Sequence, residues 1–201
     1  MLSEEIRKSI KKYKLYVLKD VLIFIIITLT IHYTYRYWAN SAHYKPIEKQ
    51  MNLAHDKMSS IVFNQSVWFI DNVLRIPIVT DDSQTIHFQN TGFITINDGC
   101  SGLKQILQFF LLMLVFPGPW KHKAWFLPMG IVIVHLTNLF RISGLAVVTI
   151  TIPEYWDFSH DNIFRPFFYV VIFLLWVWWV EKYRGPVRSA RPHRSNAATS
   201  A

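Results

Sequence analysis

The sequence lacks a second cysteine, and it contains no internal repeat and no low-complexity stretch. With Cys100 as the only thiol, a disulfide within the chain is excluded, because a disulfide needs two thiols. The 8 histidines are scattered along the chain, without the paired spacing of a zinc site. The sequence therefore predicts neither a metal nor a cofactor, and it leaves Cys100 as a free thiol.

Acidic residues are few, since 13 Asp and Glu stand against 21 Lys and Arg, for a formal net charge of +8. An excess of this kind is typical of nucleic-acid-binding proteins, in which basic residues cover one face of a domain. Here the basic residues flank apolar blocks instead. The pattern predicts no nucleic-acid partner and indicates a membrane, where flanking charges set the orientation of the chain.

Hydrophobic residues make up 52% of the sequence, which is high for a soluble protein. They concentrate in four blocks that, with flanking residues, approach or exceed the roughly 20 residues a helix needs to cross a bilayer. We therefore expect an all-α polytopic membrane protein with about four transmembrane helices. The blocks are Val21 to Tyr33, Leu103 to Phe116, Ala124 to Ile152 and Phe164 to Val180.

The charges around these blocks predict the topology. Lys and Arg are concentrated before the first block, between the second and third, and after the fourth, whereas residues 39–99 and 153–161 are richer in acids. By the positive-inside rule both termini are cytoplasmic and the acidic segments face outward from the cytoplasmic (inner) membrane. The expected parts are a basic cytoplasmic N-terminus (1–20), transmembrane helix 1 (21–38), an extracytoplasmic segment (39–99), a core with transmembrane helices 2–4 (100–180) and a basic cytoplasmic tail (181–201).

The extracytoplasmic segment is expected to hold a helix and then short β-strands. Five apolar residues recur at helical spacing, as in an amphipathic helix that lies either on the membrane or against the bundle. They are Ile47, Met51, Ala54, Met58 and Ile61. Apolar and polar residues then alternate, which is typical of strands. We expect strands at Val73 to Val79, at Ile86 and Phe88, and at Ile94 and Ile96.

Cys100 lies between the last of these strands and the second apolar block, in a stretch whose glycines permit a tight turn. The thiol is therefore expected at the N-terminus of a helix, a position that favours negative charge and lowers the pKa of a cysteine. Lys104 follows one turn later on the same face and adds a cation. The thiolate is the nucleophilic form of cysteine. A buried cysteine that only packs is the alternative.

Arg141 lies inside the third apolar block, and arginine within a membrane is costly enough to mark a candidate functional site. It follows Ala124 by about 17 residues, and at about 1.5 Å each this places it near the outer surface, at the level of Cys100. Asn138 shares its helix face and is positioned to orient the guanidinium. The alternative is an arginine that reaches toward the outer headgroups.

His160 precedes the fourth block in the outward turn and brings an imidazole to the same level. An imidazole can serve a thiol as general acid or base, and Asp157 or Asp161 could orient it. Taken alone, a loop histidine is more often a solvated surface residue. Together, the three side chains supply a nucleophile, an oxyanion stabiliser and a proton shuttle, which indicates acyl transfer through a thioester.

These residues resemble the exosortase and archaeosortase family. The resemblance rests on a Cys-Ser-Gly turn that opens a span (100–102), an Asn-x-x-Arg-Ile stretch (138–142) and a histidine before the last span. It covers mainly Phe93 to Tyr183 and implies a membrane-embedded cysteine transpeptidase with fewer spans than larger members. The catalytic residues would be Cys100, Arg141 and His160, with Lys104 and Asn138 in support, and residues 100–180 would form the catalytic core.

The resemblance also implies the substrate, an exported protein with a C-terminal sorting signal made of a short motif, a transmembrane helix and a basic cluster. The enzyme would cleave near the motif and pass the acyl group to an acceptor at the outer face of the membrane, whose lipid is the other expected partner. The residues alone leave a second hypothesis, a non-enzymatic scaffold or small transporter subunit. In it, Arg141 and Lys104 would bind an anion or a partner helix.

Overall fold

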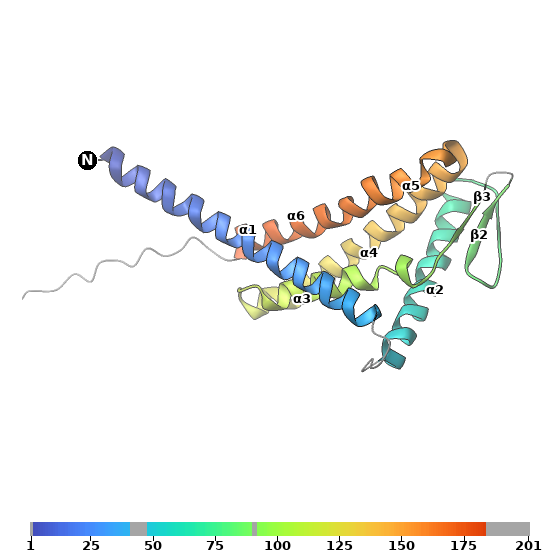
Figure 1. Cartoon of the computed structure of the whole chain (residues 1–201), viewed down its shortest axis with the longest axis horizontal. Coiled ribbons are helices and arrows are strands. Elements are labelled where there is room, and N and C mark those ends of the chain that lie inside the picture. Colours follow the sequence, from blue (N-terminus) through green and yellow to red (C-terminus); the bar gives the residue numbers. More distant parts are fainter. Residues whose placement is uncertain (1, 41–47, 90–91, 184–201) are drawn as a thin grey trace, which may run out of the picture.

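The computed structural model describes residues 2–40, 48–89 and 92–183, with side chains from Leu18 onward except those of 38–40. Nearly all of the predicted basic tail lies outside the described residues. Five long helices dominate the described part of the chain (Figure 1). They are α1 (Leu2–Asn40), α2 (Glu48–Asn72), α3 (Leu103–Val115), α4 (Trp120–Thr151) and α6 (Arg165–Tyr183).

Three helical segments are long and apolar enough to cross a membrane, namely Leu18–Tyr37 in α1, Trp120–Thr151 and Pro153–Tyr183. The apolar helix α3 has only 13 residues. This length corresponds to about 20 Å of helix, against a hydrocarbon core of roughly 30 Å. The predicted class, an all-α polytopic membrane protein, is confirmed, with α3 as a short fourth helix beside three full-length spans.

Aromatic side chains fill the centre of the bundle where α3, α4 and α6 meet. Phe109, Phe126 and Trp179 are fully buried, and the ring centre of Phe126 lies 5.1 Å from that of Trp179. Two glycines admit these rings, since a Cβ at Gly130 would overlap the Phe109 ring and one at Gly118 would overlap Trp179. Close packing of this kind holds α3 against α4 and so fixes where the segment before α3 lies.

The two ends of the bundle carry different elements (Figure 1). One end holds the α3–α4 turn and the end of α6, with exposed Lys121 and Lys182. The other end holds α2, a small sheet and the connection from α4 to α6. Exposed aromatic side chains occur at both ends, as at the two interfaces of a bilayer. They include Trp120 and Trp125 at the first end, and Tyr155 and Phe158 at the second.

The sheet has three antiparallel strands in the order β1-β2-β3. They are β1 (Ile78–Thr80), β2 (Thr85–Phe88) and β3 (Gly92–Thr95). The predicted extracytoplasmic strands are therefore present, but the first is shorter than the expected Val73 to Val79. The reason is that α2 continues to Asn72, and Arg75 with a φ of 55° then turns the chain toward β1.

Asp81 fixes the turn between β1 and β2. Its carboxylate accepts hydrogen bonds from the Ser83 hydroxyl at 2.6 Å, from His87 Nε2 at 3.0 Å and from the Thr85 amide at 3.1 Å. These bonds stabilise the ionised carboxylate and lower the pKa of Asp81 to about 2. The turn is therefore stabilised by hydrogen bonds from residues of the turn itself and of β2.

The predicted extracytoplasmic helix exists as α2, but its buried side differs from the expected one. Ile61 is 46% exposed, whereas polar residues lie among the buried ones. The buried stripe consists of His55, Ser59, Val62, Ser66 and Ile70. The inner side of α2 faces polar groups of neighbouring elements, as described below for His55. The exposed Ile61 is what the alternative of a helix lying on the membrane predicts, and Ile47 lies outside the described residues.

One face of the sheet packs on α2 and α4 and forms a second apolar cluster. Ile86 and Ile94 of the sheet are buried there with Val62 of α2 and Ile142 of α4. Cys100 lies at the margin of this cluster, partly buried. The sheet therefore places the segment that follows β3 directly over α4.

Candidate active site

Cys100 ends a single 3-10 turn, η1 (Asp98–Cys100), between β3 and α3. The Asn97 side chain caps this turn by accepting a hydrogen bond from the Gly99 amide at 3.0 Å, and the Cys100 amide donates to the Asn97 carbonyl at 2.8 Å. Gly102 then adopts a left-handed conformation with a φ of 74°, and α3 begins at the next residue. The chain thus bends sharply around Cys100, and we refer to residues 97–103 as the elbow.

Two side chains of α4 contact the elbow. Asn138 Nδ2 donates a hydrogen bond to the Cys100 carbonyl at 2.7 Å. One turn later, Arg141 lies close enough to the Cys100 side chain for the two groups to interact electrostatically. The structure therefore brings these three residues together, with Asn138 holding the cysteine backbone rather than orienting the guanidinium.

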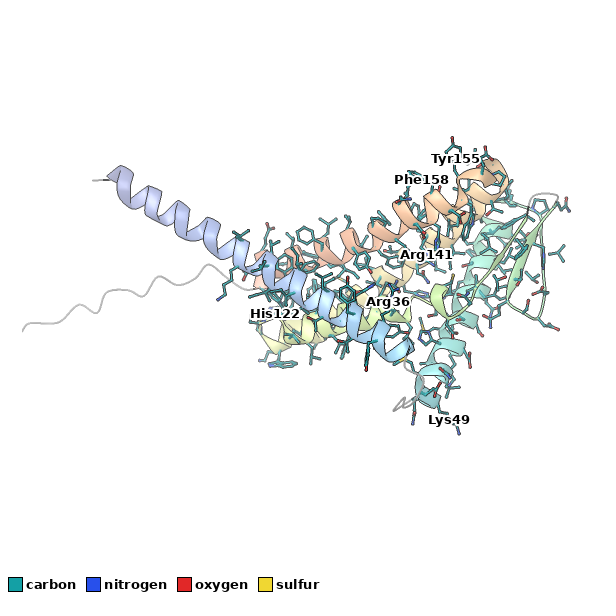
Figure 2. All side chains as sticks on the ribbon, in the orientation of Figure 1. Arg36, Lys49, His122, Arg141, Tyr155 and Phe158 are labelled. Atoms are coloured by element: carbon teal, nitrogen blue, oxygen red, sulfur yellow. The ribbon has the colours of Figure 1, made fainter. Side chains whose placement is uncertain are left out.

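Arg141 is buried, with 4% of its surface exposed. Its guanidinium carbon lies 5.7 Å from the centre of the Phe168 ring in α6, and its Nε has no hydrogen-bond partner among the described residues. Figure 2 shows Arg141 in the interior on α4, whereas Tyr155 and Phe158 point outward beyond the end of that helix. Such burial argues against a side chain that reaches toward headgroups. It also leaves an unpaired N–H that can donate to a developing negative charge.

His160 lies in a π-helical turn, η3 (Ser159–Phe164), on the connection between α4 and α6. Its Nδ1 is 2.7 Å from Asp161 Oδ1, so Asp161 is the acidic partner of the two that the sequence offered. The ring stacks on Trp156, with ring centres 5.0 Å apart and planes 7° apart. An ionised carboxylate only accepts hydrogen bonds, so Nδ1 carries the proton and Nε2 is the acceptor nitrogen of the neutral ring.

The side-chain hydrogen bond of His160 goes to Asp161 and not to the thiol. Within the described part of the chain, no hydrogen bond joins His160 to Cys100 or Arg141. Arg165 Nη1 also binds Asp161, at 3.1 Å from the oxygen that the imidazole contacts. The position of the imidazole is therefore set by an Arg–Asp–His series of contacts and by the Trp156 ring. Across the described ranges, no three His, Cys, Asp or Glu side chains are grouped so that they could hold a metal ion.

Lys104 lies in the first turn of α3 and is half-buried. Its ammonium is 5.4 Å from the centre of the Tyr35 ring, which belongs to α1. A cation over an aromatic face is attracted by the ring quadrupole. Lys104 therefore contacts α1, and any effect on the thiol acts through its charge and not through direct contact.

Sequence reasoning missed a polar series that supports the elbow from the opposite side. Ser101 is fully buried, and its hydroxyl donates to the Asp98 carbonyl at 2.7 Å. Because that proton is used, His55 Nδ1 must donate to Ser101 Oγ, 3.0 Å away. His55 Nε2 then accepts from the Tyr35 hydroxyl at 2.8 Å. The signal in the sequence was a histidine on a helix face that otherwise looked solvated.

Replacing Gly102 by alanine should destabilise the elbow. A non-glycine residue pays roughly 1–2 kcal/mol for a left-handed conformation, and the added Cβ would lie 2.9 Å from Asn138 Nδ2. We expect the thermal midpoint of the detergent-solubilised protein to fall by about 2–8 °C. Gly99→Ala is the matched control, because Gly99 has no positive φ and meets only the Asn97 side-chain oxygen at 3.2 Å. Equal midpoints for the two variants would contradict the assigned role of Gly102.

The chain is similar to a known family. The family model described as transmembrane exosortase matches residues 42–179. The matched range contains the elbow, the two contacting residues of α4 and His160, and it excludes α1. No curated protein and no solved structure matches the chain. On the extent of the family match, the chain belongs to the transmembrane exosortase family.

Proposed function

We propose that this protein is a membrane cysteine transpeptidase that cleaves the C-terminal sorting signal of exported proteins and transfers them to an acceptor. Family membership supports a membrane transpeptidase role in general. The observation that carries the specific proposal is the hydrogen bond from Asn138 to the Cys100 carbonyl, which holds the elbow on α4 one turn from the buried Arg141. A cation beside a thiol favours the nucleophilic thiolate.

The first half of the reaction forms a thioester. The Cys100 thiolate attacks the substrate carbonyl carbon, and the carbonyl oxygen becomes an oxyanion that Arg141 stabilises through its N–H groups. His160 Nε2 takes up the proton that is released when the Cys100 thiol ionises, and the imidazole gives this proton to the leaving amine as the C–N bond breaks. The part of the substrate before the cleaved bond stays attached to Cys100, and the sorting signal leaves as a free amine.

The second half releases the acyl group. Neutral His160 accepts a proton at Nε2 from the acceptor nucleophile, which attacks the thioester carbonyl. The tetrahedral intermediate again places its charge on Arg141, and its collapse expels the Cys100 thiolate. Asp161 keeps the proton on Nδ1 in both halves, which leaves Nε2 as the nitrogen that exchanges protons.

Charge supports an extracytoplasmic site in the cytoplasmic (inner) membrane with both termini in the cytoplasm. Exposed lysines lie at the α3–α4 turn and at the end of α6, whereas Asp98 and Asp161 are exposed beside Cys100 and His160. Basic residues stay preferentially on the cytoplasmic side. A substrate with a transmembrane helix and a basic end would insert in the same orientation, with its motif at the level of Cys100.

Thiol labelling tests the proposed nucleophile against a non-enzymatic scaffold. At pH 7, an impermeant maleimide applied from outside should modify Cys100 faster than the reference thiol described below, and Arg141→Gln should slow this reaction by about tenfold, because it removes a neighbouring cation. The reference is Cys100→Ala combined with Asp82→Cys, whose thiol lies in the exposed β1–β2 turn. A scaffold predicts no effect of Arg141→Gln.

A further inference from the structure

The outer strand of the sheet has a fixed set of backbone groups that face away from β2. The pairs of β2 and β3 are Thr85 with Thr95, Ile86 with Ile94, His87 with Phe93 and Phe88 with Gly92. The Ile96 amide donates to the Gln84 carbonyl at 3.0 Å, which makes those two residues a hydrogen-bonded pair. Because such pairs alternate along an antiparallel ladder, Gly92, Ile94 and Ile96 bond toward β2.

Phe93 and Thr95 therefore direct their N–H and C=O groups to the open side of β3. Side-chain contacts agree with this register, because Thr85 and Thr95 hydroxyls approach to 2.9 Å and the His87 and Phe93 rings to 5.9 Å, as in the closer non-hydrogen-bonded pairs. No backbone or side-chain partner meets the outward groups within the described ranges. Both residues are exposed, Phe93 by 64%.

The opposite edge of the sheet differs. β1 follows Pro77, and a proline beside an edge strand blocks further pairing because it has no N–H to donate. β3 instead runs directly into the elbow, so that Cys100 follows Thr95 by five residues. Unpaired strand edges accept one chemical class of partner, an extended peptide.

We propose that the substrate segment immediately before the cleaved bond binds as a fourth strand along β3, parallel to it. This inference rests on the proposed function, which supplies a peptide substrate. The substrate chain runs from the exported domain into its transmembrane helix, and β3 runs in the same sense toward the elbow and α3. A strand advances about 3.3 Å per residue. An added strand of four to six residues would thus lead from Phe93 to the thiol.

Parallel addition divides recognition into two parts. Backbone hydrogen bonds to Phe93 and Thr95 hold any sequence, while alternate substrate side chains lie on the exposed face beside the Phe93 ring. The same bonds fix the register, and the register decides which carbonyl reaches Cys100. The cleaved position is then set by a distance along the strand as well as by a motif.

Disulfide mapping in a Cys100→Ala background tests this arrangement. Thr95→Cys and Phe93→Cys supply single thiols on the outer strand, and the probe is a co-expressed exported protein that ends in a short motif, one apolar span and a basic cluster. Single cysteines are introduced at each of the ten probe residues before the span. His87→Cys is the matched control, since it is exposed on the middle strand, where both edges are already paired.

We expect crosslinks at every second probe residue, and those of Thr95→Cys should lie two residues closer to the span than those of Phe93→Cys. His87→Cys should give at least about tenfold less product, because crosslinking needs Cβ atoms within about 5 Å. Crosslinks at consecutive residues, a shift in the opposite direction or none at all would overturn the inference. Failure of the unmodified enzyme to process the probe would instead count against the transpeptidase function.

Discussion

Replacing Cys100 by alanine should abolish cleavage of a co-expressed substrate, with a loss of at least about 10⁴-fold, because no other group can form the thioester. The described residues contain no second cysteine, and the sequence contains none elsewhere. Cys100→Ser should be nearly as inactive, since a serine hydroxyl lacks a strong base in hydrogen-bonding contact at this position. The measurement is the conversion of precursor to a shorter product on a gel of the substrate protein.

The control for this prediction is that Cys100→Ala still folds and inserts into the membrane. Cys100 is only partly buried, and the contacts that hold the elbow come from its backbone and from Asn97 and Asn138. Cys100→Ala should therefore insert into the membrane at the normal level and keep its thermal midpoint within about 2 °C, since a near-isosteric change at a half-buried site costs little. Processing at the normal rate by this variant would show that the enzyme hypothesis is wrong.

Replacing Arg141 by lysine should lower the rate of cleavage by about 10²–10³-fold, the usual cost of losing one donor to an oxyanion. Lysine keeps the charge but not the planar fork, so it cannot contact the thiol and present a second N–H to the carbonyl oxygen at the same time. The measurement is single-turnover formation of the acyl-enzyme, which isolates the first half of the reaction. Arg141→Gln should be at least as severe, because it removes the charge as well.

Arg75→Lys is the matched control for Arg141→Lys, since Arg75 is exposed between α2 and β1 and far along the chain from the elbow. We expect it to leave acyl-enzyme formation unchanged. Full activity of Arg141→Lys would limit the arginine to a packing role against Phe168. Comparable loss in both variants would indicate a general effect of arginine substitution and not one on the oxyanion.

Much of the fold could be predicted from the apolar blocks and the charges that flank them. A bilayer requires apolar segments long enough to span it and favours basic residues on the cytoplasmic side, and both features are visible in the sequence. α4 and α6 were predicted in this way, as was the common level of Cys100 and Arg141. The bounds of α3 were also predicted, since the second apolar block, Leu103 to Phe116, nearly coincides with Leu103–Val115, but its packing on α4 through Gly130 and Phe109 was not. Local hydropathy does not predict contacts between residues that are distant in the sequence.

The candidate site was predicted only in part. Asn138 and Arg141 of α4 lie at Cys100, whereas no hydrogen bond among the described residues joins His160 to the thiol, and Asp161 orients its ring. The role of Asn138 differs from the expected one, because its amide is used by a backbone carbonyl that no sequence pattern marks. His55 was set aside for lack of a metal-binding partner, yet its contacts come from Tyr35 and Ser101, which are distant in the sequence.

The contact between Tyr35 and His55 bears on where the enzyme begins. The family match starts at residue 42, so α1 would be classed as a simple membrane anchor. Through Tyr35, however, α1 contacts His55, which supports the elbow at Ser101, and Lys104, which follows the elbow. A protein truncated to the matched range would keep Cys100, Arg141 and His160. It would lose the contacts that Tyr35 of α1 makes with His55 and Lys104. α1 and the candidate active site are thus one structural unit, and exchanging α1 for an unrelated span should not be a neutral change.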